Sequence, residues 1–165
     1  MKIKWFSANI TLPNTINVWL LFVVLTSCFA CSEKQDKGGS SQIIQGLKEI
    51  RPGVDLKLFR NILIIPSAGC AGCITTAEKF VLQHINELDS TLIVFTRIST
   101  KKIFNLKFGF LSDKPNVILD FDDILGQNGF SSIYPACIIV ADDSNKRIEY
   151  LSPENEYSLT ELLLL

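Results

Sequence analysis

Residues 61–73 read Asn-Ile-Leu-Ile-Ile-Pro-Ser-Ala-Gly-Cys-Ala-Gly-Cys, and they combine two patterns that together predict a fold. The run Ile62–Ile65 is continuously apolar and mostly β-branched, which is typical of a strand in a sheet that is covered on both faces. Pro66 ends the strand, and three small residues lead into Cys70 and Cys73. We therefore expect a buried strand, a short loop, and a Cys-x-x-Cys pair at the start of a helix.

Helical spacing of apolar residues appears on both sides of this stretch. Behind the cysteine pair, one apolar stripe predicts a helix that runs to about residue 88; its members are Ile74, Ala77, Val81, Ile85 and Leu88. Ahead of the strand, the apolar residues of 42–50 also fall at helical spacing, and Pro52-Gly53 stops that helix.

The remaining elements continue the alternation of strand and helix. We expect a strand over 92–95, a helix over about 100–111 capped by Ser99 or Thr100, a strand over 116–120, hairpin strands over 138–140 and 147–151, and a helix over 158–165. The acidic residues Asp120, Asp122 and Asp123 are expected in a solvated loop, with a cation site as the alternative. This order, with the hairpin last, predicts an α/β domain with helices on both faces of its sheet.

The composition excludes several classes of protein. A chain of 165 residues with 47% hydrophobic and 20% charged residues suits one domain with a short appendage, and it can bury a real core. The formal net charge is −1, and removing the two lysines near the N-terminus leaves the rest at about −3. Since no basic run or basic face is apparent, a nucleic-acid partner is not expected.

The N-terminus has the pattern of an export signal. Two early lysines precede the apolar run Val18–Leu25, which is far shorter than the ~20 residues that a transmembrane helix needs. The next residues, Leu25-Thr26-Ser27-Cys28, resemble the lipobox of bacterial lipoproteins. That resemblance implies lipidation of Cys28 and loss of residues 1–27, with Cys31 as the alternative lipidation site. An ordinary core helix is the competing interpretation of the apolar run.

A polar segment separates this signal from the folded part. Residues 32–42 contain no apolar side chain and two adjacent glycines, which predicts a flexible tether with a reach of ~17–20 Å. We therefore divide the chain into a signal peptide over 1–27, a lipid-anchored tether over 28–42 and one domain over 43–165. The predicted location is the bacterial cell envelope, anchored to a membrane and facing the periplasm or the exterior.

The cysteine pair is the best candidate for chemistry. A cysteine at the start of a helix lies beside unpaired N–H groups and the positive end of the helix dipole, which favour its thiolate. The residues alone leave three interpretations open: a reversible redox pair, a static structural disulfide, and half of a metal site. The metal interpretation is the weakest, because the chain has one histidine and no second Cys-x-x-Cys, and we expect no metal or cofactor.

Residues 61–73 resemble the active-site strand and loop of the thioredoxin superfamily, and Ile133–Val140 resembles its cis-proline segment and the following strand. Membrane-tethered thioredoxin-like proteins of the bacterial envelope are the nearest type. The resemblance implies a three-layer α/β/α sandwich with a central mixed sheet, and thiol–disulfide exchange with envelope proteins and a redox partner. It further implies that Cys70 attacks, that Cys73 resolves, and that a cis Pro135 beside the pair and Tyr134 bind the substrate.

The sequence departs from that family at three positions near the pair. Gly69 replaces the usual aromatic residue before the first cysteine, Ala71-Gly72 lacks the frequent proline, and Ile64 stands where thioredoxins place a buried carboxylate. These departures imply weaker stabilisation of the thiolate or a different substrate. The thiol pair itself is retained.

Two other functions compete with the oxidoreductase. The spacing from Pro66 to Cys73 resembles that of peroxiredoxins, in which Cys73 would be the peroxidatic thiol. A non-catalytic interaction lipoprotein, in which the disulfide only clamps the fold, is the other alternative. Outside the pair, we expect Cys137 to be a buried inert thiol, with a third redox thiol as the alternative, and His84 to be a surface residue.

Overall fold

The computed structural model describes residues 39–142, 145–154 and 159 of the chain, which belong to one compact unit, Asp36–Leu165. The predicted signal peptide, the lipidation sites Cys28 and Cys31, and nearly all of the predicted C-terminal helix lie outside the described residues. The same is true of most of the predicted tether. Among the described residues, no helix is long and apolar enough to cross a membrane.

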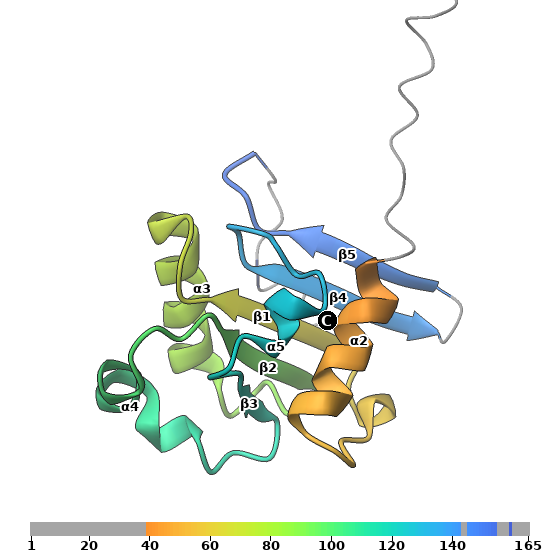
Figure 1. Cartoon of the computed structure of the whole chain (residues 1–165), viewed down its shortest axis with the longest axis horizontal. Helices are drawn as coiled ribbons and strands as arrows, with labels where there is room; N and C mark the ends of the chain where they lie inside the picture. The colour runs from red at the N-terminus through yellow and green to blue at the C-terminus, as the bar shows by residue number, and fades with distance from the viewer. Residues whose placement is uncertain (1–38, 143–144, 155–158, 160–165) are drawn as a thin grey trace, which may run out of the picture. The chain divides into compact units, whose positions relative to one another are not determined.

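A five-stranded mixed sheet forms the centre of the domain (Figure 1). Its strands are β1 (Asn61–Pro66), β2 (Thr91–Thr96), β3 (Val117–Leu119), β4 (Ala136–Asp142) and β5 (Asn145–Tyr150), in the spatial order β3-β2-β1-β4-β5. Strands β1, β2 and β3 run parallel, while β4 is antiparallel to β1 and β5 is antiparallel to β4. The predicted α/β class with a central mixed sheet is confirmed, and β1 is the middle strand.

Helices flank the sheet on both faces. They are α2 (Gly39–Ile50), α3 (Ala71–His84), α4 (Lys101–Phe108) and α5 (Ile124–Gln127), with short 3₁₀ turns η1 (Leu56–Leu58) and η2 (Gly109–Leu111). One hydrophobic cluster joins α3 and α4 to the sheet, and a second cluster joins α2 and α5 to it. The domain therefore has the three layers that the resemblance implied.

The continuous apolar run of β1 is explained by these two layers. Leu63 and Ile65 belong to the cluster under α3 and α4, while Ile62 and Ile64 belong to the cluster under α2 and α5. All four side chains are fully buried. Because successive strand residues point to opposite faces, a strand covered on both sides needs apolar residues at every position.

Helix boundaries differ from the predictions where tertiary contacts decide them. Helix α2 begins at Gly39, earlier than expected, and the buried side chain of Ser40 lies in its first turn. Helix α3 ends at His84, because the chain turns there through a bond from the Glu87 amide to the His84 carbonyl. The apolar stripe nevertheless continues to Leu88, which is buried outside the helix.

The acidic loop after β3 differs more from its prediction. Asp120 is buried, and its carboxylate accepts hydrogen bonds from the amides of Ile124 (2.8 Å) and Leu125 (3.0 Å) and from the Thr96 hydroxyl (2.7 Å). The expectation of a solvated residue is therefore wrong for Asp120. The Asp120 carboxylate caps the free N–H groups at the start of helix α5. This helix has only four residues, which is too short for a periodic apolar pattern to predict it from the sequence.

Candidate redox site

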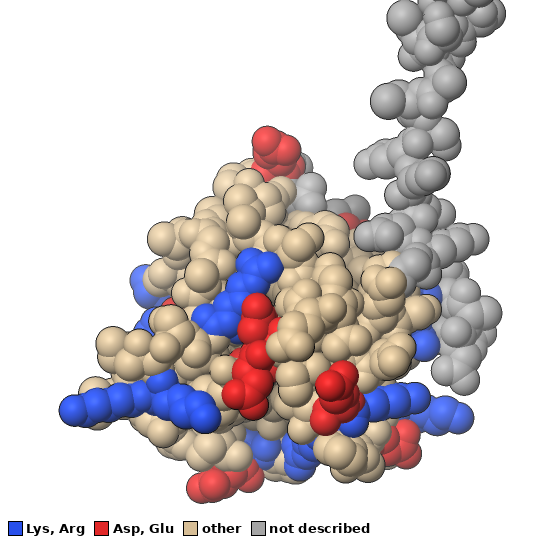
Figure 2. Space-filling model, in the orientation of Figure 1, with Lys and Arg blue, Asp and Glu red and all other residues tan. Residues whose placement is uncertain are grey.

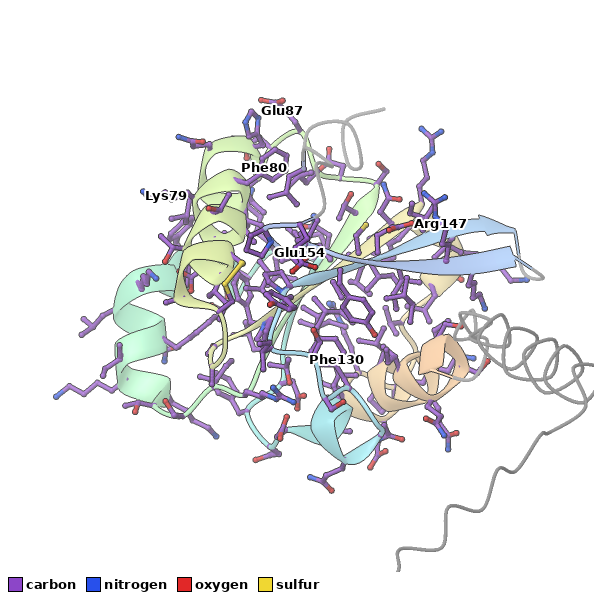
Figure 3. The ribbon with its side chains drawn as sticks, turned by 90° about the horizontal axis from the view of Figure 1, so that it is seen from above. Lys79, Phe80, Glu87, Phe130, Arg147 and Glu154 are labelled. Atoms are coloured by element: carbon purple, nitrogen blue, oxygen red, sulfur yellow. A yellow bond between two sulfur atoms is a disulfide. The ribbon has the colours of Figure 1, made fainter. Side chains whose placement is uncertain are left out.

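The cysteine pair lies at the carboxyl end of the middle strand. Cys70 is the N-cap residue of α3, and Cys73 lies within the first turn of that helix. The two sulfurs are bonded, with a Cα–Cα distance of 5.4 Å, and both residues are partly exposed (Figure 3). This separation is in the ordinary range for a disulfide. The pair is therefore accessible to an attacking sulfur from solvent.

The electrostatic setting of Cys70 follows from its place at the helix start. The first N–H groups of α3 have no partner within the helix, and the helix dipole places partial positive charge there. In the disulfide-bonded state, the Cys70 side chain makes no capping hydrogen bond to these N–H groups. After reduction of the disulfide, a negative charge on the Cys70 sulfur would be the natural partner of those N–H groups.

Gly69 allows a second chain segment to lie directly against the pair. Its φ is +149°, and a Cβ at this position would lie 2.1 Å from the Ile133 carbonyl oxygen. That same oxygen accepts a hydrogen bond from the Cys70 amide at 2.8 Å. An aromatic side chain at residue 69 cannot fit this backbone, so the departure from the thioredoxin pattern has a steric cause.

Pro135 lies at the end of this segment, and the predicted cis geometry is wrong. The described residues contain no cis peptide bond, so the Tyr134–Pro135 bond is trans. Hydrogen bonds on both sides hold this backbone: the Ser132 hydroxyl accepts from the Tyr134 amide, and the Pro135 carbonyl accepts from the Leu151 amide. The trans form is also intrinsically preferred by about 0.5–1 kcal/mol before proline.

Arg97 is a functional candidate that the sequence reasoning missed. It follows β2, has a φ of 54°, and donates hydrogen bonds of 3.0 Å each to the carbonyl oxygens of Ser132 and Phe130. Its guanidinium also lies 5.9 Å from the centre of the Phe130 ring. Arg97 therefore holds the backbone of residues 130–132. The next residue, Ile133, accepts the hydrogen bond from the Cys70 amide. Because the parallel strands β1 and β2 end at the same edge of the sheet, a basic residue directly after β2 was the sequence feature that could have placed Arg97 near the cysteine pair.

An open groove of about 500 Å³ lies next to this segment. It is lined by Ser131, Ser132, Ile133, Tyr134, Tyr150, Ser152 and Glu154. Tyr134 thus borders a surface that a substrate can reach, whereas Pro135 is buried directly before β4. The substrate-binding roles predicted for these two residues remain predictions.

Cys137 is buried within the sheet, as expected. It lies on β4 opposite Leu63 and has no exposed surface. Burial, with a smaller contribution from nearby Glu149, raises the pKa of its thiol to about 12, while Arg147 acts in the opposite direction. A thiol that stays protonated is a poor nucleophile, so Cys137 is chemically inert in the folded protein.

The other polar candidates lie apart from the pair. His84 is partly exposed at the end of α3, where its Nδ1 lies 3.2 Å from an Oε of Glu87. Within the ranges that the structure covers, no group of three His, Cys, Asp or Glu side chains could hold a metal ion.

No protein-family model, curated protein or solved structure matches this chain. Only the geometry of the domain therefore bears on its relationships. A mixed five-stranded sheet with flanking helices and a bonded Cys-x-x-Cys pair at a helix start is consistent with a thioredoxin-like fold. The trans bond before Pro135 contradicts one detail of that resemblance. The resemblance is supported by the strand arrangement and by the position of the cysteine pair.

Proposed function

We propose that the protein is a thiol–disulfide oxidoreductase that exchanges disulfides with other proteins through Cys70 and Cys73. The observation that supports this most directly is the partly exposed disulfide at the first turn of α3. A groove along the adjacent segment supplies a surface where a protein chain can bind. A disulfide that only clamps the fold needs neither solvent access nor a helix start.

The proposed reaction uses two thiol–disulfide exchanges. In the reducing direction, the Cys70 thiolate attacks one sulfur of a substrate disulfide, forms a mixed disulfide and releases the first substrate thiolate. The Cys73 thiolate then attacks the Cys70 sulfur, which releases the second substrate thiolate and leaves the Cys70–Cys73 disulfide. Two electrons pass from the protein to the substrate, which takes up two protons. The oxidising direction is the reverse, and a separate redox partner restores the starting state.

The proposed setting is the bacterial cell envelope. It rests on the export signal and lipobox pattern of residues 1–28, with lipidation at Cys28 or, alternatively, Cys31. The tether would hold the domain within reach of membrane-associated and soluble protein substrates. Mass spectrometry of the N-terminal peptide from the native host tests this part: an acylated Cys28 supports it, and retention of residues 1–27 contradicts it.

Two alternatives remain to be tested against the oxidoreductase. The first is a non-catalytic interaction lipoprotein with a structural disulfide, and the second is a peroxidase that uses Cys73. The reduction potential of the pair separates the first, because structural disulfides lie below ~−300 mV and exchanging ones lie above it. Peroxide consumption that depends on Cys73 but not on Cys70 would establish the second.

Trapping of substrates provides the decisive test. In Cys73→Ser the resolving thiol is absent, so we expect mixed disulfides between Cys70 and partner proteins to accumulate and to disappear on reduction. Cys137→Ser is the matched control, since that buried thiol should leave trapping unchanged. Iodoacetamide labelling of the reduced protein should modify Cys70 at lower pH than Cys73 or Cys137. Faster labelling of Cys73, or no trapping in Cys73→Ser, would contradict the assigned roles.

A further inference from the structure

The chain just before β4 both contacts the cysteine pair and lines the open groove. Residues 132–135 precede β4 and belong to no strand of the sheet, and we call them the groove segment. Ser132, Ile133 and Tyr134 line the groove, and the Ile133 carbonyl accepts the hydrogen bond from the Cys70 amide. A polypeptide whose disulfide reaches Cys70 from the groove would therefore pass along this segment.

A segment beside a groove can hold a bound chain through its backbone. Extended peptides bind to many proteins by adding a strand, in which main-chain N–H and C=O groups pair with those of the protein. A residue in such a pair gives its N–H group and its carbonyl to the partner strand, and each residue has only one N–H group to give. A residue whose N–H group is already bonded is therefore closed to this mode of binding.

The protein's own atoms occupy these backbone groups in the groove segment. The Ser132 hydroxyl accepts a hydrogen bond from the Tyr134 amide at 3.0 Å and donates one to the Tyr134 carbonyl at 2.9 Å. The Pro135 carbonyl accepts from the Leu151 amide at 2.8 Å, and proline has no N–H group of its own. A single side chain, that of Ser132, therefore closes both polar groups of Tyr134.

The backbone of Ser132 is held in place as well. Arg97 donates hydrogen bonds of 3.0 Å each to the carbonyl oxygens of Ser132 and Phe130. Because Ser132 is bonded through both its carbonyl and its hydroxyl, it cannot turn away from Tyr134 without breaking several hydrogen bonds. The closure of Tyr134 is thus a fixed feature of the groove.

We propose that Ser132 is a specificity-determining residue that prevents this groove from adding a substrate strand. Recognition is then left to the side chains that line the groove, including that of Ile133, which has a relative exposure of 52%. Charge contributes little selection, since Glu154 is the charged residue of the lining, and basic and acidic side chains are interspersed on the face shown in Figure 2. The inference rests on the proposed function, because it concerns how that same site meets its substrate.

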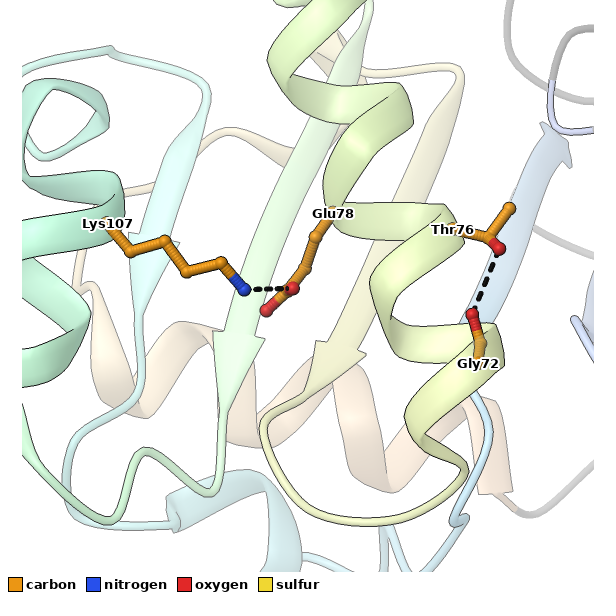
Figure 4. Close-up of polar contacts among 4 residues, drawn as sticks. All are labelled: Gly72, Thr76, Glu78 and Lys107. Atoms are coloured by element: carbon orange, nitrogen blue, oxygen red, sulfur yellow. Dashed lines mark hydrogen bonds and ion pairs between the residues drawn. The ribbon is translucent and has the colours of Figure 1, made fainter.

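Helix α3, which carries the cysteines, is held by contacts that do not involve Ser132. Lys107 of α4 pairs with Glu78, and the Thr76 hydroxyl donates to the Gly72 carbonyl at 2.9 Å (Figure 4). A substitution at Ser132 should therefore leave the helix of the redox pair in place and report on the groove segment.

Two short peptides can measure backbone pairing. Both have the same sequence with one cysteine, which forms a mixed disulfide with nitrothiobenzoate, and one of them is N-methylated at the amides that flank the cysteine. The Cys70 thiolate of the reduced protein attacks the peptide sulfur, forms a Cys70–peptide disulfide and releases the coloured thiobenzoate as its thiolate. Methylation removes the N–H groups that a paired strand would donate. Each rate is divided by the rate of the same peptide with dithiothreitol, which corrects for the reactivity of the peptide itself.

Three variants complete the experiment. Ser132→Ala frees both backbone groups of Tyr134, whereas Ser132→Thr keeps a hydroxyl at that position. Ser112→Ala is the matched control, because it also removes a hydroxyl that donates to a backbone carbonyl, that of Gly109, at a place outside the groove.

We expect the unsubstituted protein, Ser132→Thr and Ser112→Ala to react equally fast with the two peptides. Ser132→Ala should react about five- to thirty-fold faster with the unmodified peptide than with the methylated one, because two backbone groups become available for pairing. Equal rates of Ser132→Ala with the two peptides would overturn the inference. A clear preference of the unsubstituted protein for the unmodified peptide would overturn it too.

Failure of the proposed function would have a different signature. A reduced protein that releases thiobenzoate neither from the peptides nor from the symmetrical disulfide of the same thiobenzoate would contradict the oxidoreductase. The closure of Tyr134 is then tested by hydrogen exchange at its amide, which should be several-fold faster in Ser132→Ala than in the unsubstituted protein or Ser132→Thr. Equal exchange in all three proteins would overturn the inference without any redox step.

Discussion

Replacing Gly69 by alanine should destabilise the protein sharply, although only one methyl group is added. The methyl carbon would lie 2.1 Å from the Ile133 carbonyl oxygen, so one of the two backbone segments must move. A non-glycine residue held at a φ of +149° costs about 1–3 kcal/mol. Losing the hydrogen bond from the Cys70 amide to Ile133 costs about 0.5–1.5 kcal/mol more. We therefore expect a loss of ~2–4 kcal/mol in the free energy of unfolding.

Gly72→Ala is the matched control, three residues away in the same loop–helix junction. A Cβ at Gly72 meets no atom within 4 Å, and the residue lies in the first turn of α3. Alanine there should leave stability unchanged or raise it by up to ~1 kcal/mol, because glycine is a poor helix former. Urea unfolding of both oxidised variants, followed by circular dichroism, measures the difference. Equal stability of the two variants would refute the close approach of Ile133 to the cysteine loop.

Three further perturbations test separate parts of the structure. Arg97→Ala removes two partly buried hydrogen bonds, should cost about 1–3 kcal/mol and should speed amide exchange over 130–134. Arg51→Ala removes one exposed bond to the Pro115 carbonyl and a longer, partly buried bond of 3.5 Å to the Val117 carbonyl, so we expect a smaller cost of about 0.5–1 kcal/mol. Equal effects of the two variants would contradict the role of Arg97 in holding residues 130–132. Asp120→Ala leaves the amides of Ile124 and Leu125 without the carboxylate that accepts from them, and it should cost ~2–4 kcal/mol in urea unfolding. The exposed variant Asp122→Ala should cost almost nothing. For Cys137, the folded pKa of about 12 exceeds the reference value of 9.0, so the folded state retains its proton while the unfolded state ionises. Its contribution is complete below pH 9.0 and should be lost between pH 9.0 and about 12, by up to ~1.4 kcal/mol per pH unit, and Cys137→Ala should lack that slope.

Local pattern was sufficient for the parts of the fold that are buried on two faces. The run Ile62–Ile65 and the run Leu92–Phe95 became strands because only a doubly covered sheet accommodates continuous apolar residues. The cysteine pair at the start of α3 was also predictable, since the small residues before Cys70 and the apolar stripe after Cys73 define the loop and the helix. The inert environment of Cys137 followed from its place in an apolar strand.

Contacts between residues distant in sequence decided the rest. Nothing near Gly69 in the sequence indicates that the carbonyl of Ile133, 64 residues further on, will occupy the space of its missing side chain. The same holds for the bond from Arg97 to Phe130 and Ser132, and for the buried Asp120 that caps α5. Periodicity reports which face of an element is apolar, but the pairing of hydrogen-bond donors with acceptors depends on how the elements pack. For that reason the sequence alone identified the cysteine pair at the helix start, and the tertiary structure was needed to show which backbone holds it.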